Sequence, residues 1–143
     1  MDNKAFKVVT FNILALSLYI IGLFLGFIQP LYQNDASHLT YLLTFLMLFN
    51  VGASIYDSFR PTNWIDKYLV FFDEEFLFIG LIGTLVGLTL MIISIKNHGI
   101  QADQLDGLIK DFIAGLSSMF NATLFGIVCF VWTHRIVYFK RDQ

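Results

Sequence analysis

Two threonines in the C-terminal half of the chain lie in the middle of long apolar segments. Thr84 lies in Gly-Leu-Ile-Gly-Thr-Leu-Val-Gly, which begins at Gly80, and Thr123 lies in Ala-Thr-Leu-Phe-Gly, which ends at Gly126. A threonine hydroxyl donates and accepts hydrogen bonds, so it can hold a water molecule or solvate a carboxylate. Neither segment carries a charge. We therefore expect Thr84 and Thr123 to line an ion path whose ionisable group comes from another chain.

Small residues surround both threonines at steps of three and four, which places them on one face of a helix. In a membrane, such a small-xxx-small face lets two helix backbones approach closely. The stripes indicate either ordinary helix packing or a surface shared between subunits. Because one thin four-helix chain cannot satisfy both stripes, we expect them to face neighbouring copies or a central partner. The earlier stripe comprises Gly80, Gly83 and Gly87, and the later one comprises Gly115, Ser118, Ala122 and Gly126.

The composition favours a membrane protein. Of the 143 residues, 57% are hydrophobic and only 14% are charged, whereas about a quarter are charged in an average soluble domain. A helix needs about 20 apolar residues to cross the hydrocarbon core. We predict an all-α membrane protein with four transmembrane helices, because four stretches lack Asp, Glu, Lys and Arg: 8–28, 39–56, 76–95 and 112–133.

Lysine and arginine are distributed unevenly between the predicted connections. Two of them, Lys96 and Lys110, lie around the third connection, and seven lie on the side that holds both chain ends. Because positive residues are enriched in cytoplasmic loops, we predict that both termini and the connection 57–75 are cytoplasmic. The seven are Lys4, Lys7, Arg60, Lys67, Arg135, Lys140 and Arg141.

The connections between the spans are short, so residues 1–143 form a single integral membrane domain. Residues 29–38 contain a proline and an Asn-Asp pair, which are typical of a tight outer turn. In 57–75, apolar residues recur at helical spacing, and we expect an interfacial helix that is capped by Thr62 or Asn63 and continues into the third span. Asp103 is the predicted N-cap of the last helix.

Three acidic residues, Asp73, Glu74 and Glu75, directly precede the third span. We interpret them as a solvated cluster at the level of the lipid headgroups. The alternative is that they pair with Arg60 or Lys67 of a neighbouring subunit.

The sequence gives little support to other chemistry. A zinc site needs three or four converging ligands, whereas His134 is predicted on the opposite side from His38 and His98, so we expect no metal. Cys129 lies in the fourth span, where a small packing residue fits. The chain has no glycine-rich phosphate loop and no nucleophile–base pair, and a net charge of −2 without a basic tract gives no indication of a nucleic-acid partner. We expect neither an enzyme nor a cofactor.

The segments around the two threonines resemble the two signatures of the MotA/TolQ/ExbB proton-channel family. The segment that begins at Gly80 is similar to Gly-Leu-hydrophobic-Gly-Thr-x-x-Gly, and Ala-Thr-Leu-Phe-Gly-Ile from Ala122 is similar to Ala-Thr-x-x-Gly-hydrophobic. The order of the signatures, their spacing and the short outer connection agree with that family. The resemblance covers residues 76–138, under half of the chain.

This resemblance implies the channel subunit of a motor or stator that is driven by the proton-motive force in a bacterial-type inner membrane. In the family, the long last two helices of five copies line a central pore around the single membrane helices of two MotB/TolR/ExbD-type partners. A partner aspartate takes up and releases the proton, and Thr84 and Thr123 match the two pore threonines. Membrane lipid surrounds the ring.

The layout resembles TolQ and ExbB more closely than a full flagellar stator, because the large cytoplasmic domain is reduced to 57–75. Ser118 occupies the position of a glutamate in the ExbB branch, and the third and fourth spans lack the prolines of the flagellar branch. An alternative from another class stays open. It is a small structural or pore-forming membrane protein, such as an assembly scaffold or a holin-like oligomer, whose small-residue faces serve packing alone.

Overall fold

The computed structural model describes residues 3–33, 35, 38–98 and 105–141, and within these ranges the chain forms helices and no strand. Four of the helices are long and apolar enough to cross a membrane, which confirms the expected all-α membrane architecture. The helices are α1 (Asn3–Phe24), α2 (Gln29–Gln33), α3 (Leu39–Phe59), α4 (Asn63–His98) and α5 (Leu105–Arg141).

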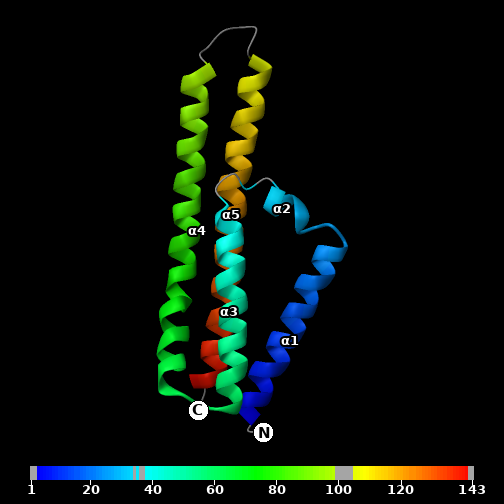
Figure 1. Cartoon of the computed structure of the whole chain (residues 1–143), viewed down its shortest axis with the longest axis vertical. Coiled ribbons are helices and arrows are strands. Elements are labelled where there is room, and N and C mark those ends of the chain that lie inside the picture. The colour runs from blue at the N-terminus through cyan, green and yellow to red at the C-terminus, as the bar shows by residue number, and fades with distance from the viewer. Residues whose placement is uncertain (1–2, 34, 36–37, 99–104, 142–143) are drawn as a thin grey trace.

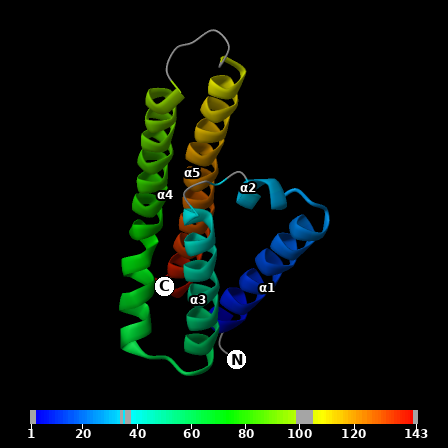
Figure 2. The same cartoon turned by 45° about the horizontal axis from the view of Figure 1, so that its top comes forward.

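The helices α4 and α5 form a long antiparallel hairpin, the tallest part of the molecule (Figure 1). Next to it lies α3, and α1 packs on α3 near the N-terminus and leans away from the hairpin further along (Figure 2). Both chain ends lie at one end of the bundle, together with the turn between α3 and α4. We call this the basal end (3–7, 57–66 and 135–141) and the opposite end, where α4 finishes and α5 starts, the distal end.

A proline and a buried carboxylate shape the turn between α3 and α4. The residue before a proline disfavours the helical conformation, and Arg60, which precedes Pro61, has left the helix with φ −138° and ψ 86°. The backbone N–H and the hydroxyl of Thr62 donate to Asp57 Oδ1 at 2.7 and 3.1 Å. From there α4 runs without a break, which confirms that the interfacial helix predicted in 57–75 continues into the third span.

The connection between α1 and α3 is more structured than the tight turn predicted for 29–38. The helix α1 ends at Phe24, earlier than the predicted 28, and Gly26 turns the chain with a φ of 77°, a conformation that glycine tolerates. After α2, Asp35 is buried with 2% of its surface exposed. Its Oδ2 accepts the backbone N–H of Thr40 at 2.7 Å, so this carboxylate satisfies the first turn of α3 from inside the protein.

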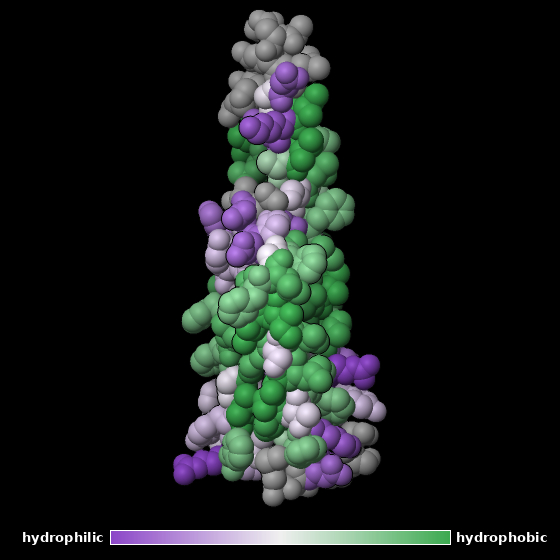
Figure 3. All heavy atoms as spheres, turned by 90° about the vertical axis from the view of Figure 1, so that its right-hand side faces the viewer, coloured by the Kyte–Doolittle hydropathy of each residue, from purple (hydrophilic) through white to green (hydrophobic). Residues whose placement is uncertain are grey.

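The apolar stretches of the four helices do not lie at one height. Asn50 Nδ2 donates to Thr133 Oγ1 at 3.3 Å; Thr133 ends the charge-free stretch of α5, whereas α3 stays charge-free for more than a turn beyond Asn50. Leu39, the first residue of α3, lies beside Gly83, and from there α4 continues to His98 through about 22 Å of helix. The hairpin therefore projects past α2, and Figure 3 shows polar residues at mid-height between two apolar zones.

The apolar core lies between α3, α4 and α5, and α1 closes it on one side. Cys129 is fully buried with its Sγ 3.5 Å from Met47 Sδ, as expected for a small packing residue. Phe11 of α1 packs edge-on against Trp132 of α5. One side of α5 is thus committed to this core, and another side packs along α4.

Candidate functional site

The two stripes of small residues meet within one chain, along the facing sides of α4 and α5. We call this contact, from Asp73 to Met91 of α4 and from Gly115 to His134 of α5, the α4–α5 seam. At its centre, a Cβ atom added to Gly126 would lie 2.9 Å from the Cα of Gly80. Contact between these two backbones is therefore possible only because neither residue has a side chain.

The expectation that both stripes face other subunits is wrong, because the antiparallel hairpin buries one stripe against the other. A Cβ atom on Gly87 would lie 2.6 Å from the Cγ of Met119, and one on Gly83 would overlap the Cβ of Ala122. Towards the distal end, a Cβ atom on Gly115 would lie 2.8 Å from that of Met91. Five predicted packing glycines, together with Ala122, thus serve intrachain packing: Gly80, Gly83, Gly87, Gly115 and Gly126.

Ser118, which was predicted to be on the later stripe, faces another part of the chain. It is fully buried, and its hydroxyl donates to Asp35 Oδ1 at 3.0 Å. A carboxylate from the α2–α3 connection therefore lies against α5 within its charge-free stretch 112–133. The sequence pattern does not predict this contact, because a proline followed by an Asn-Asp pair is typical of an outer turn.

The two predicted ion-path residues lie side by side across the seam. The hydroxyls of Thr84 and Thr123 are in direct hydrogen-bond contact. Each hydroxyl also lies within reach of its own helix: Thr84 Oγ1 is 3.2 Å from the carbonyl oxygen of Gly80, and Thr123 Oγ1 is 3.0 Å from that of Met119. Two hydroxyl protons thus face three hydrogen bonds, so only two of the three can form at once.

Thr123 also borders a groove on the exposed face of the hairpin, with a volume of about 500 Å³. Leucine and phenylalanine side chains of α4 that are largely exposed form one wall. Glu74 lies at the basal end of the groove, which places a carboxylate and a hydroxyl at different heights of one apolar surface. The residues that line the groove are Glu74, Leu77, Phe78, Leu81, Thr123 and Ile127.

A histidine–carboxylate pair marks the basal end of the seam. Asp73 Oδ2 lies 2.9 Å from His134 Nδ1, and within the described part of the chain Asp73 Oδ1 is buried without a hydrogen-bond partner. The pairing with Arg60 or Lys67 of a neighbouring subunit stays a prediction, and Asp73 itself is not fully solvated. It joins the basal part of α4 to α5.

Sequence reasoning missed a set of buried polar contacts between α1, α3 and α5. Asn12 is fully buried; its Nδ2 donates to Ser54 Oγ at 2.9 Å, and its Oδ1 accepts the Trp132 Nε1–H at 2.9 Å. The contact between Asn50 and Thr133 lies close by. The available signal was a single amide in each of the charge-free stretches 8–28 and 39–56, because a buried amide needs partners on other helices.

A second missed cluster ties α2 to the spans. The hydroxyl of Tyr32 lies 2.5 Å from that of Tyr19 and 2.5 Å from that of Thr44. Burial raises the pKa of Tyr32 well above its ordinary value. Its hydroxyl therefore stays protonated and can donate a hydrogen bond to one of the two neighbouring hydroxyls.

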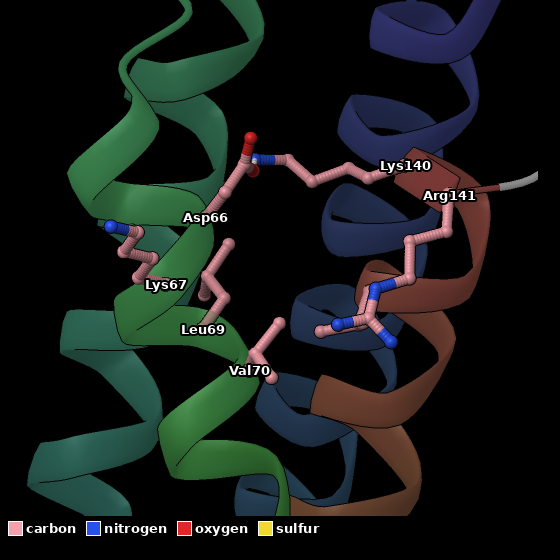
Figure 4. A pocket seen from close by; sticks show the side chains of 7 residues that line it. Asp66, Lys67, Leu69, Val70, Lys140 and Arg141 are labelled. Atoms are coloured by element: carbon pink, nitrogen blue, oxygen red, sulfur yellow. Dashed lines mark hydrogen bonds and ion pairs between the residues drawn. The ribbon is translucent and has the colours of Figure 1, made fainter.

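The basal ends of three helices meet at Lys140. Its ammonium binds the buried Asp57 of α3 and, at 2.7 Å, Asp66 of α4. Figure 4 shows Lys140 reaching from α5 to Asp66. One side chain from the last turn of α5 thus fixes both sides of the α3–α4 turn.

Among the described residues, no three His, Cys, Asp or Glu side chains converge as metal ligands. The side chain of His98 and the predicted N-cap Asp103 lie outside the described residues. No protein-family model, curated protein or solved structure matches the chain.

Proposed function

We propose that the chain is the channel subunit of a proton-driven motor in a bacterial-type inner membrane, with both termini cytoplasmic. The proposal combines the resemblance of the two threonine segments to the MotA/TolQ/ExbB signatures with the geometry of the seam. Five copies surround the membrane helices of two MotB/TolR/ExbD-type partners. Proton flow past a partner aspartate then drives rotation or force transmission.

The observation that carries the proposal is the contact between the hydroxyls of Thr84 and Thr123. Two hydroxyl protons are shared among three possible hydrogen bonds. One hydroxyl can therefore turn its proton towards a new acceptor while the other hydroxyl keeps one of the remaining bonds. A partner carboxylate in the groove accepts a hydrogen bond from the Thr123 hydroxyl when it is ionised, and donates its own O–H to that hydroxyl oxygen when it is protonated. The threonine pair thereby holds the carboxylate in both charge states.

The lack of an acid in the apolar stretches of α4 and α5 supports a carboxylate from another chain, because the buried Asp35 is hydrogen-bonded to Ser118 and Thr40 and does not line the groove. Between Glu75 and Lys96, α4 has no ionisable side chain, and α5 has none but Cys129 between Asp111 and His134. Cys129 is buried on the α3 side of α5, so it does not serve the groove. Proton relays within membranes need ionisable groups, and a partner helix supplies one.

The two small-residue stripes give no support to the ring of five, because they are buried within the chain. The support that remains is the family resemblance and the exposed apolar face of the hairpin beside Thr123. Leu81, Leu85 and Phe78 are 55%, 57% and 58% exposed on that hairpin. A neighbouring copy, a partner helix or lipid has to cover them in a membrane.

The test is co-expression with a neighbouring gene that encodes one membrane helix with an early aspartate, followed by native mass spectrometry and proton-flux measurements in proteoliposomes. A mass of five chains and two partners is expected. Thr84→Val and Thr123→Val each remove one hydrogen bond to a buried group, worth about 1–3 kcal/mol. Flux should then fall by about tenfold to a hundredfold, with Thr84→Ser retaining much of it.

Thr89→Val is the matched control. Thr89 lies on α4, is exposed, and donates only to the carbonyl of Leu85 at 2.8 Å, so its loss should leave flux unchanged. Full flux in the Thr84→Val, Thr123→Val double variant would remove the pair from the ion path. A stable monomer or dimer that binds no such partner and lyses cells on expression would favour the pore-forming or scaffold alternative.

A further inference from the structure

A cavity of about 360 Å³ opens at the basal end, between the first turns of α4 and the last turn of α5 (Figure 4). Its apolar wall consists of Leu69 and Val70 from α4 and Val137 from α5. Leu69 and Val137 are buried, and Val70 is partly exposed. The cavity thus combines an apolar wall with a charged rim.

The cations on the rim are not all neutralised. Lys140 is engaged by Asp57 and Asp66, so neither this lysine nor Asp66 is free to pair with another ion. Within the part of the chain that the structure describes, no carboxylate binds Arg141 or Lys67. Figure 4 shows the Arg141 side chain extending from α5 towards Val70, whereas Lys67 points away across α4.

The cavity lies level with the basal end of the charge-free stretch of α3. Lys140 binds Asp57, the first charged residue of α3 after the charge-free stretch 39–56, so the cavity lies where that helix leaves the apolar zone. A headgroup layer extends only about 5–8 Å beyond the hydrocarbon core on each side. A ligand at this position would have its charged part at the rim and apolar chains along the membrane-facing wall.

We infer that this cavity binds an anionic phospholipid, with the phosphodiester on the Arg141 guanidinium and the start of an acyl chain against Val70 and Val137. A guanidinium binds two phosphate oxygens at once, and basic pockets between membrane helices bind such headgroups. The basal end (3–7, 57–66 and 135–141) holds six basic and two acidic residues, so its general positive charge also attracts anionic lipid. A local site is distinguished from this general attraction by comparing Arg141 with a basal cation that lies outside the cavity.

The experiment titrates the purified chain in mild detergent with phosphatidylglycerol or phosphatidylcholine of identical acyl chains, and native mass spectrometry counts the bound lipid. Phosphatidylglycerol should bind at lower concentration. Arg141→Gln should weaken this binding about fivefold, as expected for one cation near an anionic lipid. Lys67→Gln, at the margin of the cavity, should have a smaller effect.

Arg60→Gln is the control, because Arg60 is an exposed basal cation outside the cavity. The Arg60→Gln variant should bind phosphatidylglycerol with the same affinity as the unmodified chain. Equal binding of the two lipids, or equal losses for Arg60→Gln and Arg141→Gln, would overturn the inference. Competition by glycerol phosphate at comparable concentration would indicate a free phosphate site and would likewise overturn it, whereas unchanged lipid binding supports a site that needs the acyl chain.

Discussion

Gly80 of α4 and Gly126 of α5 face each other across the hairpin with no room for a side chain between them. A methyl group on Gly126 would lie 2.8 Å from the carbonyl oxygen of Phe76 as well as 2.9 Å from the Cα of Gly80. Both neighbours are backbone atoms, which cannot rotate away. The hairpin has to separate locally before any side chain fits at this position.

Gly126→Ala should therefore lower the free energy of unfolding by about 1–3 kcal/mol, the usual cost of overpacking a tight contact. The measurement is reversible unfolding in detergent, followed by circular dichroism. Gly52→Ala is the control, because a Cβ atom there meets nothing within 4 Å and alanine is the better helix former. Equal stability of Gly126→Ala and Gly52→Ala would contradict the close packing of the seam.

The contact between Thr84 and Thr123 predicts that their substitutions are not additive. Thr84→Val, Thr123→Val and the double variant form a double-mutant cycle for the free energy of unfolding. We expect a coupling energy of about 0.6–1.7 kcal/mol, the range for hydrogen bonds between membrane helices. Pairing either residue with Thr89→Val should give no coupling; a coupling of zero between Thr84 and Thr123 would mean that the hydroxyls do not interact.

Asn12 should be the most costly polar residue of α1 to remove. Asn12→Ala leaves the Trp132 Nε1–H and the Ser54 hydroxyl with one partner fewer in a buried place, at a cost of about 1–3 kcal/mol. Ser17→Ala on the same helix should have little effect, because Ser17 is exposed and donates only to the carbonyl of Ile13 at 2.8 Å. Unfolding followed by Trp fluorescence compares the two, and equal losses would contradict the bridging role of Asn12.

The two carboxylates at Lys140 should differ in their effect on stability. Asp57 has 5% of its side chain exposed and Asp66 has 57%. Asp57→Asn leaves Lys140 short of its buried partner and should cost up to about 3–5 kcal/mol, whereas Asp66→Asn should cost less than about 1 kcal/mol. Denaturant unfolding at low ionic strength measures both, and the reverse order would show that the exposed pair is the one that secures the turn.

Much of the helical layout could be predicted from the pattern of charged and apolar residues along the sequence. The charge-free stretches located the four long helices, and the amphipathic spacing after Pro61 predicted that α4 starts well before its apolar part. The pairing of Thr84 with Thr123 was not predicted, although both residues were selected. Their contact depends on the register between α4 and α5, which the glycines set through backbone approach and not through any pattern of charge.

The positions of Asp35 and Ser118 show where sequence reasoning fails for a physical reason. An Asp beside an Asn after a proline is typical of an exposed turn, and only the packing of α2 against the spans buries it. Contacts between residues so distant in sequence follow from tertiary packing, and local propensity carries no information about them. For the same reason, the small-residue stripes predict subunit contacts, whereas the hairpin buries them within one chain.

The projection of the hairpin beyond α2 has a consequence for the surrounding bilayer. The charge-free stretch of α4 is shifted towards the distal end relative to that of α3, although the two stretches are of similar length. Lipids around a single copy would meet the hydrophobic surface at different heights on the two flanks, at a cost of fractions of a kcal/mol per Å of mismatch. That elastic cost would fall where like flanks of two copies adjoin.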